Sequence, residues 1–283
     1  MFEAIAFAGG GNRCYWQGGF WEAAAPALGW TPELVVGVSA GAWSACYSLL
    51  GCGRRVNALV ADNCGGERRN FEWREWRRGR SPWPVAGMYL SLIETIVDAD
   101  AFARLQAGPD LLIALARKPR RLPLGLAIPL GIAAYQIEKA WAAPVHPRGG
   151  RALGFRPEFV RVQDLAGPAD LVAALMASAS VPPFMPVGRV GGLAALDGGL
   201  VDNVPVEPLE AVAARGGRTL VILSRRYKAF PPVPGRLYVQ PSAPVPIGQF
   251  DITDPDGIRR AYEMGLADGE AFARRHGDGA AVL

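Results

Sequence analysis

Short apolar runs alternate with longer amphipathic stretches through the first fifty residues of the chain. Residues 2–8 and 34–38 are short apolar runs, the second rich in β-branched side chains, and each predicts a buried strand. Between them, residues 14–28 place apolar side chains along one stripe, which predicts a helix that ends at Gly29. Small residues continue from Ser39 to about Leu50 and predict another helix. This order of strand, helix, strand and helix is typical of a parallel sheet with helices on its faces.

The rest of the chain continues this alternation, apart from one less regular stretch. Residues 65–150 are basic and rich in tryptophan and proline, and we interpret them as an elaboration that covers the functional site. No internal repeat or clear linker divides the chain, so residues 1–283 are expected to form a single domain. The pattern predicts further helices at 54–62, 98–117 with an interruption at 108–109, 169–178 and 256–275, and further strands at 157–164, 219–224 and 236–240.

Positive charge is concentrated early in the chain, although the net charge is only +4. Basic clusters can bind anionic lipid headgroups or nucleic acid, but they also form ordinary solvated helix faces. We expect no nucleic-acid partner. Aromatic residues among these arginines predict either an interfacial patch or ordinary core positions. The basic residues are Arg54, Arg55, Arg68, Arg69, Arg74, Arg77, Arg78, Arg80, Arg117, Lys118, Arg120 and Arg121, and the aromatic ones are Trp73, Trp76, Trp83 and Tyr89.

The cysteines and the N-terminal residues indicate the cellular compartment in which the protein is expected. The four cysteines form no C-x-x-C pair, so they predict reduced thiols rather than zinc ligands or a disulfide framework. Residues 1–8 lack a basic region and lead into a glycine loop, which predicts a first strand rather than a signal peptide. The best candidate for a membrane span, residues 122–135, is short and contains two prolines. We expect a cytoplasmic protein, and peripheral contact with the inner face of the membrane stays open.

A serine stands where the second predicted strand meets the following helix. In Gly37-Val38-Ser39-Ala40-Gly41, the glycines lack a Cβ, so the strand and the helix can approach closely across a sharp turn. This setting is that of a nucleophile elbow. The helix N-terminus behind the serine presents free N–H groups to a developing oxyanion. The stretch predicts that Ser39 is a nucleophile, with Gly37 and Gly41 in support.

A serine nucleophile requires a base within hydrogen-bond reach, and histidine is the usual one. The chain has only His146 and His276, and neither lies in a motif that favours this role. The better candidate is Asp197, which ends an apolar run and is followed by Gly198-Gly199 in a turn. Asp202 lies beyond the glycine pair and is a weaker candidate. A carboxylate base needs a partly desolvated site, which raises its pKa toward the working pH.

Three consecutive glycines follow the first predicted strand. The backbone N–H groups of Gly9, Gly10 and Gly11 can form an anion-binding nest, and Arg13 adds positive charge nearby. The sequence therefore predicts an oxyanion hole in this loop.

A rival interpretation of the same loop is a dinucleotide-binding fingerprint. Cys14 replaces the third glycine of that fingerprint, and Glu33 stands about twenty residues further on. No Walker-type Gly-Lys-Ser/Thr motif occurs in the chain.

These blocks, in this order and spacing, resemble the patatin-like phospholipase family. The blocks are residues 9–13, 37–41 and 197–199, with further likeness at 177–184, at Asn203 and Pro205, and at 260–265. The resemblance runs from about residue 3 to about residue 275, with the middle poorly matched. It implies a three-layer α/β/α fold with a mostly parallel central sheet.

The resemblance also implies roles for individual residues. Ser39 and Asp197 correspond to a Ser–Asp dyad, and Arg13 occupies the family's basic position. The glycines at 9–11 correspond to the oxyanion hole. Cys14 departs from the glycine that commonly follows the basic residue.

We therefore predict a lipid acyl hydrolase, of phospholipase A or esterase type, that cleaves carboxylic esters through an acyl-enzyme and uses no metal or cofactor. The alternatives are a nucleotide-binding protein that uses the loop at 9–11 and an inactive lipid-binding protein of the same fold. The sequence leaves open the headgroup, the acyl chain, the position of the cleaved ester and the oligomeric state.

Overall fold

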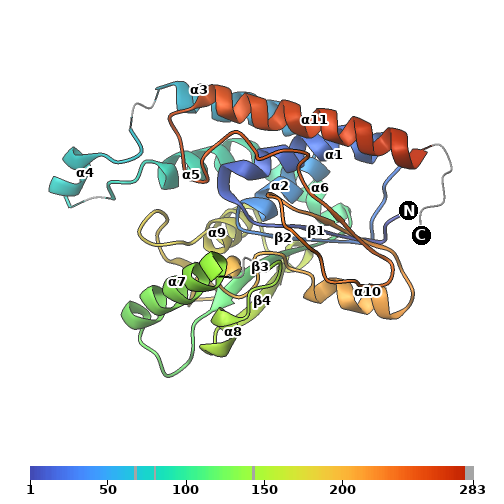
Figure 1. The fold of residues 1–283 in the computed structure, drawn as a ribbon. Coiled ribbons are helices and arrows are strands. Elements are labelled where there is room, and N and C mark those ends of the chain that lie inside the picture. The colour runs from blue at the N-terminus through green and yellow to red at the C-terminus, as the bar shows by residue number, and fades with distance from the viewer. Residues whose placement is uncertain (67–68, 80, 142–143, 278–283) are drawn as a thin grey trace.

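Parallel strands form the centre of the computed structural model, which describes residues 1–66, 69–79, 81–141 and 144–277 (Figure 1). Ala4 of β1 lies opposite Leu34 of β2 and Thr219 of β7, so β1 is aligned with both neighbours from its first residue. The carboxyl ends of these strands share one edge of the sheet, where ligand sites of open α/β sheets form. The strands run in the order β3 (Asp110–Arg117), β2 (Leu34–Val38), β1 (Ala4–Phe7), β7 (Thr219–Ile222) and β8 (Arg236–Val239).

Antiparallel strands extend the sheet beside β3. β4 (Arg156–Arg161) pairs along one edge of β3. β6 (Leu193–Asp197) pairs with Leu115 and Ala116 on the other edge, which β2 occupies as far as Ala114. β2 and β6 therefore meet head to head along β3, and their last residues converge. β5 (Gly188–Val190) forms a hairpin with β6.

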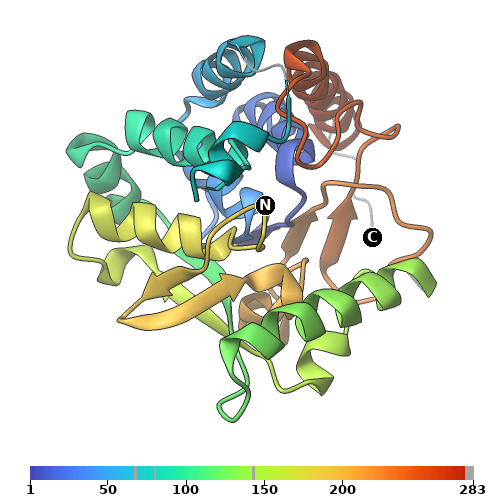
Figure 2. The same cartoon turned by 90° about the vertical axis from the view of Figure 1, so that its left-hand side faces the viewer.

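Helices cover both faces of the sheet and make three layers (Figures 1 and 2). Successive strand residues point to opposite faces, so Phe7 and Val35 belong to one core and Ala6 and Val36 to the other. The first core includes side chains from α1 (Tyr15–Ala27), α2 (Ala40–Leu49), α3 (Gly53–Gly66), α5 (Val85–Ile96), α6 (Ala99–Ala107), α9 (Pro168–Ser178) and α11 (Pro255–Gly277). The second core includes α10 (Glu210–Ala214), while α7 (Leu124–Trp141) packs against β6 and the end of β3, with α8 (Gly149–Ala152) beside it.

Short helices complete the chain. They are α4 (Trp73–Arg77) and the 3₁₀ helices η1 (Gly11–Cys14), η2 (Val162–Asp164), η3 (Gly198–Leu200) and η4 (Glu207–Leu209). Among the described residues, none of the helices combines the length and the hydropathy that a transmembrane span requires.

The predicted fold class, a three-layer α/β/α fold with a mostly parallel sheet, is confirmed. The strands predicted at 2–8, 34–38, 219–224 and 236–240 are β1, β2, β7 and β8, and the strand predicted at 157–164 is β4 followed by η2. The helices predicted at 14–28, 54–62, 169–178 and 256–275 are α1, α3, α9 and α11.

The helix predicted at 98–117, with an interruption at 108–109, is confirmed as far as the interruption and wrong beyond it. Asp98 caps α6 by accepting a hydrogen bond from the Ala101 N–H at 2.8 Å, and the helix ends before Gly108. Residues 110–117 then form β3, a central strand. Because both faces of a central strand are buried, its sequence shows no alternation of polar and apolar residues, and a run rich in leucine and alanine resembles a helix.

The described part of residues 65–150, predicted to be an elaboration that covers the functional site, also contributes to the sheet and to the core. They supply β3 to the sheet, and Ile93 and Phe102 to the core. Trp73 and Trp76 on α4 are 59% and 58% exposed, whereas Trp83 packs against Phe184 with 4.5 Å between ring centroids. Arg68 and Arg80 of the predicted basic cluster lie outside the described residues.

Candidate active site

Ser39 lies at a strained turn between β2 and α2. Its φ of 55° and ψ of −135° make it the one non-glycine residue with positive φ in the described part of the chain. A Cβ at Gly37 would lie 2.4 Å from the Ala42 Cα, and a Cβ at Gly41 would lie 2.4 Å from the Ala8 carbonyl oxygen. The two glycines therefore allow α2 to fold back on β2 and to approach β1. Strain of this kind costs about 1–3 kcal/mol and occurs where the surrounding structure holds a functional side chain in place.

Ser178, at the end of α9, holds this turn. The Ser39 N–H donates to Ser178 Oγ at 2.8 Å, and Ser178 Oγ donates to the Ala114 carbonyl of β3 at 2.6 Å. Ser178 is fully buried, so these bonds are shielded from water. Sequence reasoning noted this segment only as part of a family likeness, since no local signal shows that a serine on α9 reaches the turn after β2.

Asp197 ends β6 and contacts the Ser39 side chain. It is 6% exposed and lies opposite Leu115 of β3, one residue beyond the partner of Val38. Burial raises the pKa of the Asp197 carboxyl to about 6, while the hydrogen bonds that it accepts from the Ser39 hydroxyl and the Gly199 N–H act in the opposite direction. The Gly199 N–H donates to Oδ1 at 2.7 Å. The structure thus brings the two predicted dyad residues into direct contact.

Gly198 and Gly199 let the chain turn sharply just beyond Asp197. A Cβ at Gly198 would lie 2.7 Å from both the Ala114 carbonyl oxygen and Val38 Cγ2. A Cβ at Gly199 would lie 2.8 Å from Asn203 Oδ1 and 2.9 Å from Asp197 Oδ1. A side chain at position 199 would therefore displace the Asp197 carboxylate, and one at position 198 would clash with β3 and with Val38.

The glycine loop lies next to Ser39, but its three N–H groups differ in whether they already donate a hydrogen bond. The Gly9 N–H donates to the Asn203 carbonyl at 3.0 Å, and the Gly9 carbonyl accepts from Ser224 Oγ at 2.6 Å. Gly10 lines a cavity with Ser39 and Asp197, and Gly11 lines a second cavity with Ser39. No hydrogen bond from the Gly10 or Gly11 amide to another described residue is found. As far as the described residues show, the free amides of the loop are therefore those of Gly10 and Gly11, and Gly9 anchors the loop.

Arg13 and Cys14 directly follow the glycine loop, and Arg13 holds it by hydrogen bonds. Arg13 Nε donates to the Gly10 carbonyl at 3.3 Å, and Arg13 Nη2 donates to Gln249 Oε1 at 3.0 Å. Cys14 has a φ of −70°, which any residue can adopt, so the departure from glycine does not disturb the loop. Burial raises the pKa of the Cys14 thiol to about 12, so the thiol stays neutral.

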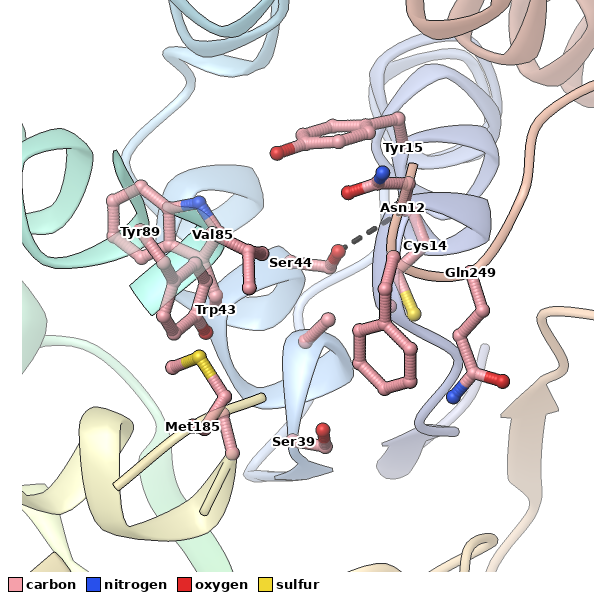
Figure 3. Close-up of a pocket in the computed structure, with 14 residues that line it drawn as sticks. Asn12, Cys14, Tyr15, Ser39, Trp43, Ser44, Val85, Tyr89, Met185 and Gln249 are labelled. Atoms are coloured by element: carbon pink, nitrogen blue, oxygen red, sulfur yellow. Dashed lines mark hydrogen bonds between the residues drawn. The ribbon is translucent and has the colours of Figure 1, made fainter. Parts of the chain in front are cut away.

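Two cavities meet at Ser39. The first, of about 50 Å³, is mostly apolar and extends between α2 and α5, past Trp43, Tyr89 and Met185 (Figure 3). The second, of about 80 Å³, extends toward Ile132 and Tyr135 of α7. The serine hydroxyl is thus reached from two sides.

The other candidate bases lie elsewhere. His146 Nδ1 contacts Asp202 Oδ2 at 3.0 Å, and His276 Nδ1 contacts the Phe272 carbonyl at 2.9 Å. Neither histidine lines the cavities at Ser39. Asp202 is engaged with His146, which leaves Asp197 as the carboxylate at the serine.

The interpretation of the glycine loop as a dinucleotide-binding fingerprint fails at the acidic residue that it requires. Glu33 lies before β2, at the opposite edge of the sheet from the glycine loop, where it forms an ion pair with Arg215 at 2.6 Å. An acidic residue that binds a ribose would have to lie near the loop. In the described part of the chain, no cluster of histidine, cysteine and acidic side chains could hold a metal ion.

Comparison with known proteins assigns the chain to a family. A search of curated protein sequences found no match. The sequence model of the family described as patatin-like phospholipase matches residues 5–210, a range that includes the glycine loop, the Ser39 turn and Asp197. Proteins of this family are lipid acyl hydrolases. Since the match covers most of the chain, the protein belongs to the patatin-like phospholipase family.

Proposed function

We propose that the protein hydrolyses carboxylic esters of lipids with Ser39 as the nucleophile and Asp197 as the base. The observation that carries this proposal is the direct contact between a strained serine and a buried carboxyl whose pKa is raised to about 6. A base with a pKa near neutrality is largely ionised at pH 7 and still accepts a proton readily. The intact contact supports an active enzyme over a lipid-binding protein that has lost its activity.

The first half of the reaction forms an acyl-enzyme. Asp197 takes the proton from Ser39 Oγ, and Oγ attacks the ester carbonyl carbon. The amides of Gly10 and Gly11 stabilise the oxyanion, and one such donor contributes roughly 3–4 kcal/mol to the lowering of the barrier. Asp197 then returns its proton to the departing alcohol oxygen.

The second half releases the fatty acid. Asp197 takes a proton from a water molecule, whose oxygen attacks the acyl carbon. Ser39 Oγ departs and regains a proton from Asp197. The two cavities at Ser39 suit this scheme, since the mostly apolar one beside Trp43 and Met185 would hold the acyl chain and the other would hold the alcohol portion.

The dyad is tested by removing each member separately. Ser39→Ala and Asp197→Asn should each abolish hydrolysis of a short-chain nitrophenyl ester in folded protein, and a fluorophosphonate probe should label Ser39. The matched control is Ser48→Ala on the same helix, because the buried Ser48 Oγ has no hydrogen-bond partner in the described part of the chain. Full activity in either dyad variant, or probe labelling of another residue, would overturn the proposal.

A further inference from the structure

A continuous chain of aromatic rings runs from the exposed helix α4 to the cavities at Ser39. Phe250 lines both of those cavities, and its ring stacks on that of Phe184 with 4.9 Å between the centroids. Further ring contacts, with 4.5–5.2 Å between centroids, join Phe184 to Trp83, Trp83 to Phe71, Phe71 to Trp73 and Trp73 to Trp76. Aromatic pairs at these separations are in packing contact, so the rings form one packed path from the surface to the site.

The two tryptophans at the outer end of this chain lack the cover that a tryptophan has in a protein core. Trp73 and Trp76 are 59% and 58% exposed, and α4 projects from the body of the protein (Figure 1). Their inner neighbours Phe71 and Trp83 are partly buried. A tryptophan combines a large apolar ring with a polar N–H group, and such side chains are enriched where a membrane meets water. Exposed rings on a projecting helix therefore indicate contact with an apolar partner.

The charge around these tryptophans indicates the kind of partner. The acidic residues of the segment, Glu72 and Glu75, are partly buried, and Glu75 forms an ion pair with Arg78 at 2.8 Å. Arg74 and Arg77 have no carboxylate partner among the described residues. Such a surface is complementary to a layer of anionic headgroups over an apolar interior, because the rings can enter the apolar layer while the guanidinium groups stay with the headgroups. The exposed residues beside the two tryptophans are Arg74, Arg77, Arg78 and Gly79.

Hydrogen bonds tie the same segment to the loop at 249–252, which carries the last ring of the chain. Asn70 Nδ2 donates to Asp251 Oδ1 at 3.1 Å, and Asn70 Oδ1 accepts from the Ile252 N–H at 2.9 Å. The loop also accepts a hydrogen bond of 2.9 Å from the Asn12 N–H, next to the glycine loop. The segment that carries the tryptophans is therefore connected to the site both by rings and by hydrogen bonds. Contiguous contacts of this kind can carry a coupling between two sites.

We propose that α4 docks on an anionic lipid surface and that docking increases the turnover of esters held in that surface. The two tryptophans enter the apolar layer, and the two unpaired arginines stay at the level of the headgroups. The chain of rings transmits the contact to Phe250 at the cavities. The docking surface stands on its own, whereas its effect on turnover rests on the proposed function. The partner is a surface made of many molecules, and the identity of the ester at Ser39 plays no part in its recognition.

Docking is measured by co-sedimentation with vesicles in the Ser39→Ala background, so that the result does not depend on catalysis. This protein should bind phosphatidylglycerol vesicles more tightly than phosphatidylcholine vesicles. Adding Trp73→Ala/Trp76→Ala should weaken binding to the anionic vesicles by about tenfold to a hundredfold, because two exposed rings lose their transfer into an apolar layer. Adding Arg74→Gln/Arg77→Gln should remove the preference for anionic vesicles. The matched control is Trp141→Ala at the end of α7, where the tryptophan is 90% exposed, and it should leave binding unchanged.

The effect on turnover is measured with Ser39 present. The readout is the rate of hydrolysis of an ester held in phosphatidylglycerol vesicles, divided by the rate on a soluble short-chain nitrophenyl ester. Trp73→Ala/Trp76→Ala should lower this ratio about tenfold or more, in line with the loss of binding. Phe184→Leu interrupts the chain of rings, so it should keep vesicle binding and still lower the ratio. Trp141→Ala should keep the wild-type ratio.

The outcomes separate this proposal from the previous one. Unchanged vesicle binding in the double tryptophan variant, or an equal loss in the Trp141→Ala control, would overturn docking through α4. An unchanged ratio in Phe184→Leu would overturn the transmission through the rings. Self-association that the tryptophan variant abolishes, without vesicle binding, would assign α4 to a second copy of the chain and overturn the lipid surface. Should the tryptophan variant not fold, the arginine variant tests the same surface. If the wild type does not hydrolyse the soluble ester, the proposed function fails, and the binding experiment still decides the docking surface.

Discussion

Gly9 and Asn203 are joined by two hydrogen bonds. The Gly9 N–H donates to the Asn203 carbonyl at 3.0 Å, and Asn203 Nδ2 donates to the Gly9 carbonyl at 2.9 Å. One residue belongs to the loop after β1 and the other follows η3, a few residues beyond Asp197. The pair therefore fixes the proposed oxyanion hole relative to the proposed base, although the two segments lie far apart in the sequence.

Removing the Asn203 side chain should reduce catalysis more than substrate binding. Asn203→Ala removes one of the two donors to the Gly9 carbonyl, which keeps its bond from Ser224 Oγ at 2.6 Å. The loss of about 0.5–1.5 kcal/mol for such a bond corresponds to a fall in kcat of roughly twofold to thirteenfold. Steady-state kinetics on a nitrophenyl ester would measure kcat and KM separately. Asn57→Ala is the control, since Asn57 is also buried and donates to a backbone carbonyl, that of Ile258, away from the site. It should lower stability and leave kcat unchanged; an unchanged kcat in Asn203→Ala would contradict the prediction.

The activity should follow the ionisation of Asp197. Because the pKa of this carboxyl is raised to about 6, kcat/KM should rise with pH through a midpoint near 6 and then level off, with about a tenth of the maximum at pH 5. The profile is measured on a neutral ester, whose own charge does not change with pH. A midpoint that moves in His146→Gln would assign the titration to that histidine and contradict the role of Asp197.

The same carboxyl should make the protein less stable as the pH rises. Its pKa is above the ordinary value of 3.8, so the folded state binds the proton more tightly than the unfolded state does, and the stabilisation present below pH 3.8 is lost as the pH passes through 6. The full loss is about 3 kcal/mol at neutral pH, with 1.36 kcal/mol for each pH unit between the two pKa values. Asp197→Asn removes this dependence and should be inactive, yet gain stability relative to the wild type as the pH is raised.

Urea denaturation at about pH 5 and pH 8 measures the free energy of unfolding of Asp197→Asn and of the wild type. The variant's gain over the wild type should be larger at pH 8. Asp62→Asn, at a mostly exposed aspartate, is the matched control and should show no gain that grows with pH. If the free energies of unfolding of Asp197→Asn and the wild type differ by the same amount at both pH values, the Asp197 carboxyl is not desolvated in the folded protein.

The sequence was sufficient for features that depend on local chemistry. The strand–glycine–serine–helix pattern predicted the turn at Ser39, and the apolar run before Asp197 predicted a strand that ends at a carboxylate. β3 was missed because a strand buried on both faces loses the alternation by which strands are recognised. The contacts of Ser178 and Asn203 depend on segments that only the fold brings together, and nothing in the neighbouring sequence indicates them.

Gly9 shows a further limit of local reasoning. Three consecutive glycines suggest three equivalent amides, but only the structure shows that the first of them is occupied by Asn203. The number of available donors was thus a tertiary property, whereas the presence of the loop was a local one.

The head-to-head meeting of β2 and β6 on β3 determines where the chain can tolerate a change in length. Because alternate strand residues face opposite sides, an insertion or deletion of one residue between Ala195 and Asp197 would turn Leu196 toward Ser39 and the carboxyl away from it. The hairpin tip at Gly191 and Gly192 has open space around it and precedes this pairing. We therefore expect natural or engineered length variation to accumulate at that tip, and the short stretch between the tip and Asp197 to keep a fixed length.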